Sequence, residues 1–156
     1  GELAYGFRKI LDTGIDDKFV NEYCCQQFVT HKLLKENPEG AAAVTRALQK
    51  ASAFVEAEPR ITAQMQIENN LVAGDLDFNA ALLDELNFIP SRSLGKKTFD
   101  SAARQLQTAG ILKKDTDIEK FIAQGYIELF GVPDGYSYDS ATKTYSEING
   151  VRTSFN

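Results

Sequence analysis

The clearest pattern of apolar and polar positions lies between residues 37 and 58 and predicts one long amphipathic helix. Asn37 is a favourable N-cap residue, and Pro38 takes the first helical position, where its missing N–H costs no hydrogen bond. Glu58 ends the helix, because the residue before a proline is disfavoured in the α conformation. The spacing predicts a buried stripe of Val44, Ala47, Leu48, Ala51, Phe54 and Val55, and a solvent-facing side with Arg46, Gln49, Lys50 and Glu56.

Two more helices are expected directly after this one, and a short helical turn at 31–36 precedes it. Pro59 starts the first of the two, which Gly74 ends. Asp77 is expected to cap the second. Their predicted apolar faces are Ile61, Met65, Leu71 and Val72 on the first, and Phe78, Ala81, Leu82 and Leu86 on the second.

The remaining elements are two helices and a hairpin. One helix is expected from Lys97 to Ala109, with Gly110 just past its end, and Asp117 is expected to cap the other. Tyrosines alternate around a polar turn between 136 and 148, which predicts a hairpin. The apolar faces of the helices are Phe99, Ala103 and Leu106, and then Ile118, Phe121, Ile122 and Leu129.

Strand patterns are few. A strand is expected from Lys9 to Thr13, and a buried strand from Tyr23 to Thr30. The expected fold class is therefore α/β but helix-dominated, with about five helices, few short strands and a C-terminal hairpin. Such a helical layer lacks most of the sheet that helices usually cover.

Composition limits the partners. The chain has 156 residues, a net charge of −5 and 43% hydrophobic residues, which fits one globular domain. The acidic balance disfavours nucleic acid, which requires clustered Lys and Arg. No apolar run reaches the roughly 18 residues needed to cross a bilayer.

Candidate chemistry is sparse. Cys24 and Cys25 are adjacent, and their expected role is as two small buried apolar residues; a vicinal disulfide or an exposed redox thiol pair is the alternative. A metal site is not expected, because His31 is the only histidine. Asp75 opens an Asp-x-Asp-x-Asn run that lacks the glycine and glutamate of a calcium loop. No motif for a nucleophile, a metalloprotease or a phosphate-binding loop is present, so no enzyme activity and no cofactor are expected.

One stretch of the chain resembles the returning segment of ABC-importer solute-binding proteins. It consists of the run EYCC, the apolar segment after it, and then KENPE, AAA, TRA and KA. The group is the nitrate, sulfonate, taurine and thiamine-precursor type. The resemblance extends more weakly to about Val132 and covers roughly the C-terminal half of such a protein. It implies part of a type II periplasmic-binding fold, with residues 1–22 ending the second lobe and 23–156 belonging to the first.

The resemblance also implies a site and a location. The chain crosses between lobes near Asp12, Glu22, Tyr23 and Cys24, which would border the solute cleft. The partners would be a small anionic organic or inorganic solute and an ABC permease. A periplasmic location, or an extracellular one with a membrane anchor, is implied; because no signal peptide or lipobox occurs at Gly1, the sequence would then be a trimmed or partial chain.

A function of another class stays open. A helical layer without its sheet would expose a large apolar patch, and such patches usually mark association. The alternative is therefore a helical interaction or scaffold domain that forms a homodimer without a small ligand. An enzyme related to pyrimidine-precursor synthesis would need a histidine-rich site, which this chain lacks.

Overall fold

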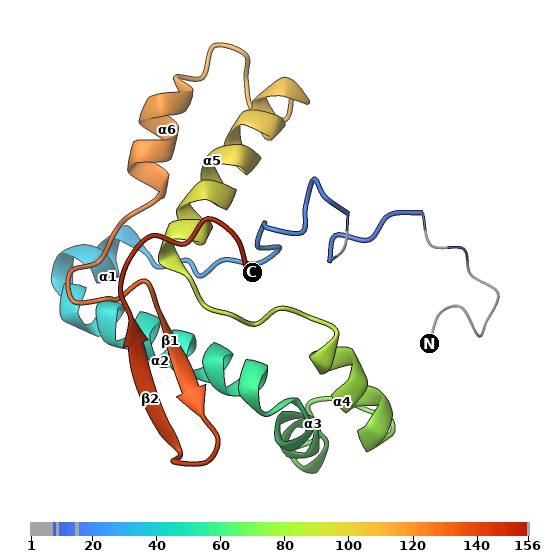
Figure 1. The fold of residues 1–156 in the computed structure, drawn as a ribbon. Coiled ribbons are helices and arrows are strands. Elements are labelled where there is room, and N and C mark those ends of the chain that lie inside the picture. The colour runs from blue at the N-terminus through green and yellow to red at the C-terminus, as the bar shows by residue number, and fades with distance from the viewer. Residues whose placement is uncertain (1–7, 9, 15, 156) are drawn as a thin grey trace.

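The computed structural model describes residues 8, 10–14 and 16–155, which form a helix-dominated α/β fold (Figure 1). The described part contains six helices and one two-stranded antiparallel sheet. α3 packs on α4, α5 packs on α6, and α1 and β1 both contact α2. The helices are α1 (His31–Glu36), α2 (Pro38–Ala57), α3 (Pro59–Glu68), α4 (Leu76–Asp84), α5 (Arg92–Thr108) and α6 (Ile118–Gly125).

The predicted start and end of the long helix are confirmed. Pro38 is the first residue of α2, and the Asn37 side chain accepts a hydrogen bond of 2.8 Å from the Gly40 N–H. This bond satisfies one of the N–H groups that have no partner inside the helix. α2 ends at Ala57, immediately before Glu58 and Pro59.

The boundaries of α3 and α4 differ from the prediction. α3 ends at Glu68, six residues before Gly74, because Asn70 adopts a left-handed conformation with φ of 56°. Leu71 and Val72 therefore lie outside the helix. Asp75, and not Asp77, caps α4, since its Oδ1 accepts from the Phe78 N–H at 3.0 Å. Asp77 instead pairs with Arg60 at 2.6 Å.

The two later helices were predicted with partial success. α5 begins at Arg92, five residues before the predicted Lys97, because the Ser91 hydroxyl caps it by accepting from the Leu94 N–H at 3.2 Å. Asp117 caps α6 as predicted, accepting from the Lys120 N–H at 3.1 Å. α6 ends at Gly125, so Leu129 lies beyond its apolar face.

The C-terminal hairpin is confirmed, and the two predicted N-terminal strands are wrong. β1 (Gly135–Asp139) pairs antiparallel with β2 (Thr144–Ile148), with Tyr138 opposite Tyr145. In the described part of the chain, Tyr23–Thr30 belongs to no sheet, although it runs without helix or turn over residues 25–30. Residues 10–14 also form no strand, and Lys9 of that prediction lies outside the described residues.

α2 buries a different face from the predicted one. The hairpin packs mainly on its polar side: Gln49 donates to the carbonyl of Pro133 at 3.2 Å, and the Lys50 ammonium lies 4.9 Å from the Tyr136 ring centroid. Of the predicted stripe, Phe54 does pack on the hairpin, with its ring centroid 5.1 Å from that of Tyr138. The predicted stripe is largely open, with Val44 and Leu48 each 50% exposed. A hydrophobic pattern marks the face that prefers burial, but only a partner can bury it. The residues of α2 that are buried are Ala41, Ala42 and Ala53.

A buried polar junction joins β1 to α5. Asp134 is 3% exposed, and its carboxylate accepts from the Ser93 N–H at 2.8 Å and from the Ser91 hydroxyl at 2.9 Å. The Asp134 carbonyl accepts from the Arg92 N–H at 2.7 Å and from the Gln49 amide at 3.1 Å. A carboxylate at a helix N-terminus also interacts favourably with the helix dipole.

We expect Gly135→Ala to destabilise the protein by about 1–3 kcal/mol, the usual cost of forcing extra volume into a packed site. A Cβ at position 135 would overlap the carbonyl oxygen of Pro90, which is backbone and cannot rotate away. Urea unfolding measures the free-energy difference. The matched control is Ser137→Ala on the exposed part of β1, which should change stability by less than about 0.5 kcal/mol. Equal stability of Gly135→Ala and the wild type would contradict this packing.

Candidate functional site

A groove of about 810 Å³ lies between the segment Tyr23–Val29, α2, the start of α5, and the chain around the end of α6. This volume lies within the range of small-molecule sites, roughly 300–1,000 Å³. Its polar lining residues come from different elements and include Gln26, Gln49, Ser52, Ser91, Arg92 and Tyr126.

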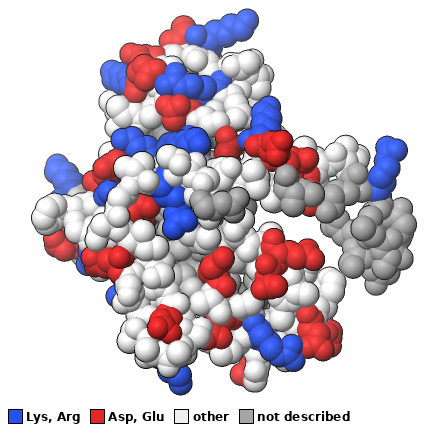
Figure 2. All heavy atoms as spheres, in the orientation of Figure 1, with Lys and Arg blue, Asp and Glu red and all other residues white. Residues whose placement is uncertain are grey.

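The charge in the groove is opposite to that of the whole chain. Among its described lining residues, Arg92 is the one Lys or Arg, and no Asp or Glu is present, although the net charge of the chain is −5. The Arg92 guanidinium donates to the carbonyl of Val132 at 3.1 Å. Elsewhere, basic and acidic side chains are interspersed over the visible face of the molecule (Figure 2). Arg92 therefore gives the described groove lining its one cationic side chain, while the carboxylates of Glu128 and Asp134 lie close behind the lining and act with it on Tyr126.

Aromatic residues form the wall of the groove near α6. Phe99 stacks on Phe121 with ring centroids 6.1 Å apart and lies 5.9 Å from Tyr126. Gly125 permits this arrangement, because a Cβ there would lie 2.6 Å from the Phe99 ring. The Tyr126 hydroxyl donates to the carbonyl of Arg92 at 2.7 Å, which ties the end of α6 to the start of α5.

Of the sequence-predicted site residues, Tyr23 lines the groove. Its hydroxyl donates to the carbonyl of Ile89 at 2.6 Å, and its N–H donates to the Thr98 hydroxyl at 3.1 Å. Its ring meets Phe155 edge to face at 5.1 Å. Burial raises the pKa of the Tyr23 phenol, so this group stays neutral and acts as a hydrogen-bond donor.

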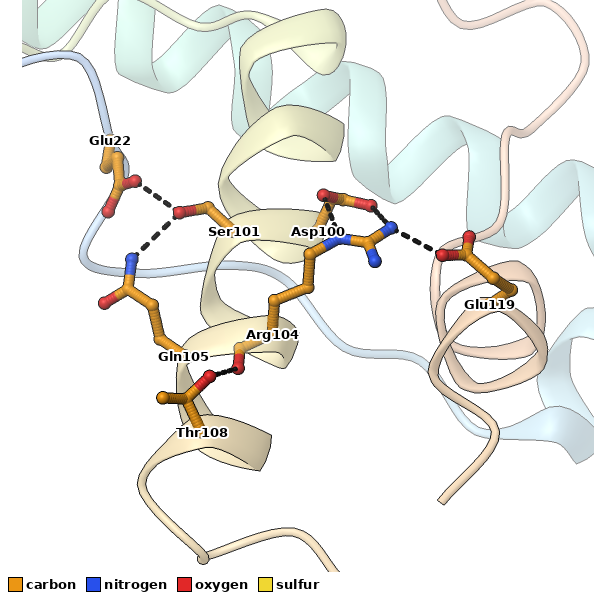
Figure 3. Close-up of polar contacts among 7 residues, drawn as sticks. All are labelled: Glu22, Asp100, Ser101, Arg104, Gln105, Thr108 and Glu119. Carbon is orange, nitrogen blue, oxygen red and sulfur yellow. Dashed lines mark hydrogen bonds and ion pairs between the residues drawn. The ribbon is translucent and has the colours of Figure 1, made fainter. Parts of the chain in front are cut away.

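Glu22 and Asp12 lie outside the groove lining. Glu22 accepts a hydrogen bond of 2.7 Å from Ser101 on α5, and Gln105 donates to the same hydroxyl at 2.9 Å (Figure 3). Asp12 accepts from the Gly14 N–H at 2.9 Å in a local turn. Glu22 therefore anchors its segment to α5, as Tyr23 also does, but lies outside the groove lining.

The two cysteines are exposed free thiols, so the prediction that they are buried is wrong. Their Sγ atoms lie 3.5 Å apart, and Cys25, but not Cys24, lines the groove. The hydrogen bond with the Cys25 thiol raises the pKa of Cys24. Within the described residues no strand pairs with the segment 23–30, and its Phe28 side chain is 82% exposed.

A charged cluster fixes α6 on α5 near this region. Arg104 makes two hydrogen bonds to Asp100, at 2.9 and 3.0 Å, and an ion pair of 2.9 Å with Glu119 on α6 (Figure 3). The Arg104 guanidinium lowers the pKa of the Asp100 carboxyl. Because these groups are near the surface, their contribution to the free energy of folding is small. Their role is to orient the two helices.

Arg92, Gln26 and Tyr126 were missed as candidates from the sequence. Arg92 is the first residue of α5, but the sequence pattern predicts that this helix begins five residues later. The pattern therefore gave no indication that Arg92 lies at a helix N-terminus. The described residues contain no group of three or more His, Cys, Asp and Glu side chains arranged to hold a metal. None of the described helices is both long and apolar enough to cross a membrane.

Comparisons with known proteins give no match to a family model, to a curated protein or to a solved structure.

We expect the protein to lose stability between pH 10 and about 12, in part because burial raises the pKa of Tyr126 from 10.0 to about 12. In that range the unfolded chain releases the phenol proton and the folded chain retains it, so rising pH favours unfolding. Urea unfolding at several pH values should show a shallower loss for Tyr126→Phe than for the wild type. Tyr145→Phe, which removes the hydroxyl of an exposed tyrosine and keeps its ring, should retain the wild-type slope. Parallel losses in Tyr126→Phe and the wild type would contradict the assignment.

Proposed function

We propose that this chain is the C-terminal part of a solute-binding protein that serves an ABC importer, and that it contributes one wall of the site for a small anionic solute. The observation that carries the proposal is the groove beside the Tyr23 segment, which holds Arg92 and no carboxylate among its lining residues. The order of motifs from EYCC through KENPE in the sequence supports the same assignment.

The groove offers the groups that such a solute needs. The guanidinium of Arg92 can make paired, charge-assisted hydrogen bonds to a carboxylate or sulfonate. Amide and hydroxyl groups of Gln26 and Ser52 can bind the remaining polar atoms of the solute, and Phe99 and Phe121 give an apolar wall. No covalent chemistry is required of any of these residues.

The exposed stripe of α2 supports a two-lobe protein. Val44 and Leu48 lie on the side of α2 away from the hairpin, and they remain half exposed. In a two-lobe binding protein, such helices cover a sheet to which another part of the chain contributes strands. The extended segment 25–30 lies across the groove from α2 and would be one strand of that sheet. Solute binding between the lobes would favour the closed arrangement, which is the form presented to the permease.

We expect at least one anion from a panel of nitrate, alkyl sulfonates, taurine and small carboxylates to raise the melting temperature in a concentration-dependent manner. Thermal-shift titrations at constant ionic strength measure this. Arg92→Gln should weaken the apparent affinity about tenfold or more, which corresponds to about 1.4 kcal/mol. Arg92→Lys, which retains the positive charge, should lose less.

The matched control is Arg60→Gln, which removes an equal charge from α3 outside the groove. If Arg60→Gln and Arg92→Gln reduce the response equally, the effect is one of net charge. If no anion in the panel raises the melting temperature of the wild type at millimolar concentration, this chain does not bind anions by itself, and the proposed site fails.

A second candidate function is association with another copy of this chain through the α3–α4 pair. The observation in its favour is that apolar side chains on both helices remain between 43% and 52% exposed. Exposed apolar surface of this kind is typical of interaction sites. The residues are Ile61, Met65, Phe78 and Leu82.

This second candidate predicts a dimer of roughly twice 17.3 kDa by size-exclusion chromatography with light scattering. Leu82→Glu should shift the population to monomer, because burying an unpaired charge is costly. Ala123→Glu, which adds the same charge on an exposed position of α6, should leave the dimer intact. A wild-type monomer at all concentrations tested would reject self-association.

A further inference from the structure

The adjacent thiols of Cys24 and Cys25 form a pair whose geometry differs from that of a disulfide. Their Sγ atoms are 3.5 Å apart, and both side chains are exposed. A disulfide requires an S–S distance of about 2.05 Å and usually separates the two Cα atoms by more than about 4.4 Å. Neighbouring residues joined by a trans peptide have Cα atoms about 3.8 Å apart, so direct S–S bonding would strain this segment.

The observed distance is that of a thiol–thiol hydrogen bond, and it also leaves the two sulfurs close enough to bond to one central atom. Two sulfurs that each bond to the same atom at about 2.3 Å, with near-tetrahedral angles, lie roughly 3.5–3.8 Å apart. A structural zinc ion would need four ligands, and the described residues offer no third His, Cys, Asp or Glu here. The suitable central atom is therefore one that binds sulfur strongly and needs only two sulfur ligands from the protein.

The residues on both sides of the pair hold it in place. Tyr23 is fixed by hydrogen bonds to Thr98 and Ile89, and Gln26 donates from its side chain to the carbonyl of Gly95 at 3.0 Å. Both anchors join the segment to α5 or to the chain just before it. The thiols are thus held on a segment tethered on both sides, with Cys25 on the groove lining and Cys24 outside it. The tethers reduce the entropy lost when both thiols bind one atom.

We propose that Cys24 and Cys25 form a chelating site for a monosubstituted trivalent arsenical, a class of compound whose arsenic carries one organic group and binds two thiolates. In the reaction with an arsenoxide, two As–S bonds form, two S–H bonds break, and the oxide oxygen leaves with both protons as water. Arsenic remains trivalent, so the step needs no oxidant or reductant. This site is independent of the proposed solute function.

The test uses phenylarsine oxide and the full chain, reduced and then freed of reductant. Intact-mass spectrometry should show one adduct, equal to one phenylarsine oxide minus one water. The adduct should persist in excess 2-mercaptoethanol and disappear on addition of 1,2-ethanedithiol, because a dithiol competes for both As–S bonds and a monothiol does not. No persistent adduct on the wild type would overturn the proposal.

Cys24→Ser and Cys25→Ser are the matched variants, since each leaves one thiol at the same place. Both should lose the adduct in 2-mercaptoethanol while their far-ultraviolet circular dichroism stays that of the wild type. Persistence of the adduct in either variant would overturn the proposal. Competition with 2-mercaptoethanol in buffer and in urea measures the contribution of the fold. The folded chain is expected to retain the arsenical more tightly than the unfolded chain. Equal retention would show that the tethers do not organise the site.

Discussion

The structure depends most on the carboxylate of Asp134 at the N-terminus of α5. It accepts hydrogen bonds from the Ser91 hydroxyl and the Ser93 N–H, while its backbone carbonyl accepts from Arg92 and Gln49. These bonds connect α2, α5 and β1 at one buried point. Since a buried carboxylate is costly unless its oxygens are satisfied, Asp134 must meet the N-terminus of α5 in this arrangement. Gln49 adds α2 to the junction through the backbone carbonyl of Asp134. Ser91 and Asp134 therefore determine where the groove residue Arg92 is placed.

This junction also has a consequence for binding. A helix N-terminus is a ready site for an anion, but here the protein's own carboxylate occupies it. A solute in the groove would have to use the side chain of Arg92, which is the basis of the proposed anion site. Of the dithiol, Cys25 lines the groove and Cys24 lies outside the lining, and the pair uses different chemistry from that of Arg92, so the two proposals stand or fail separately.

Some helices of the molecule are joined to their neighbours by polar contacts, and others have exposed apolar faces. Around α5 and α6, polar contacts such as Arg104 with Asp100 and Glu119 join the elements. By contrast, apolar side chains remain about half exposed on α2, α3 and α4. They are Val44 and Leu48 on α2, Met65 on α3 and Leu82 on α4. Both candidate functions are based on the exposed apolar faces of these three helices, because each function provides a partner that would cover such a face. The partner is another lobe in the first function and a second copy of the chain in the second.

The sequence by itself determined the elements whose causes are local. Asn37 and Pro38 start α2, Asp117 caps α6, and the tyrosine alternation gives the hairpin, because caps and turns depend on neighbouring residues. Tertiary structure decided what depends on distant partners. It placed the hairpin on the polar side of α2 and began α5 at Arg92, after the Ser91 cap that Asp134 meets. It also left the segment 23–30 without a paired strand among the described residues. An apolar pattern states which residues favour burial, but burial and strand pairing need a second surface, and local sequence does not specify that surface.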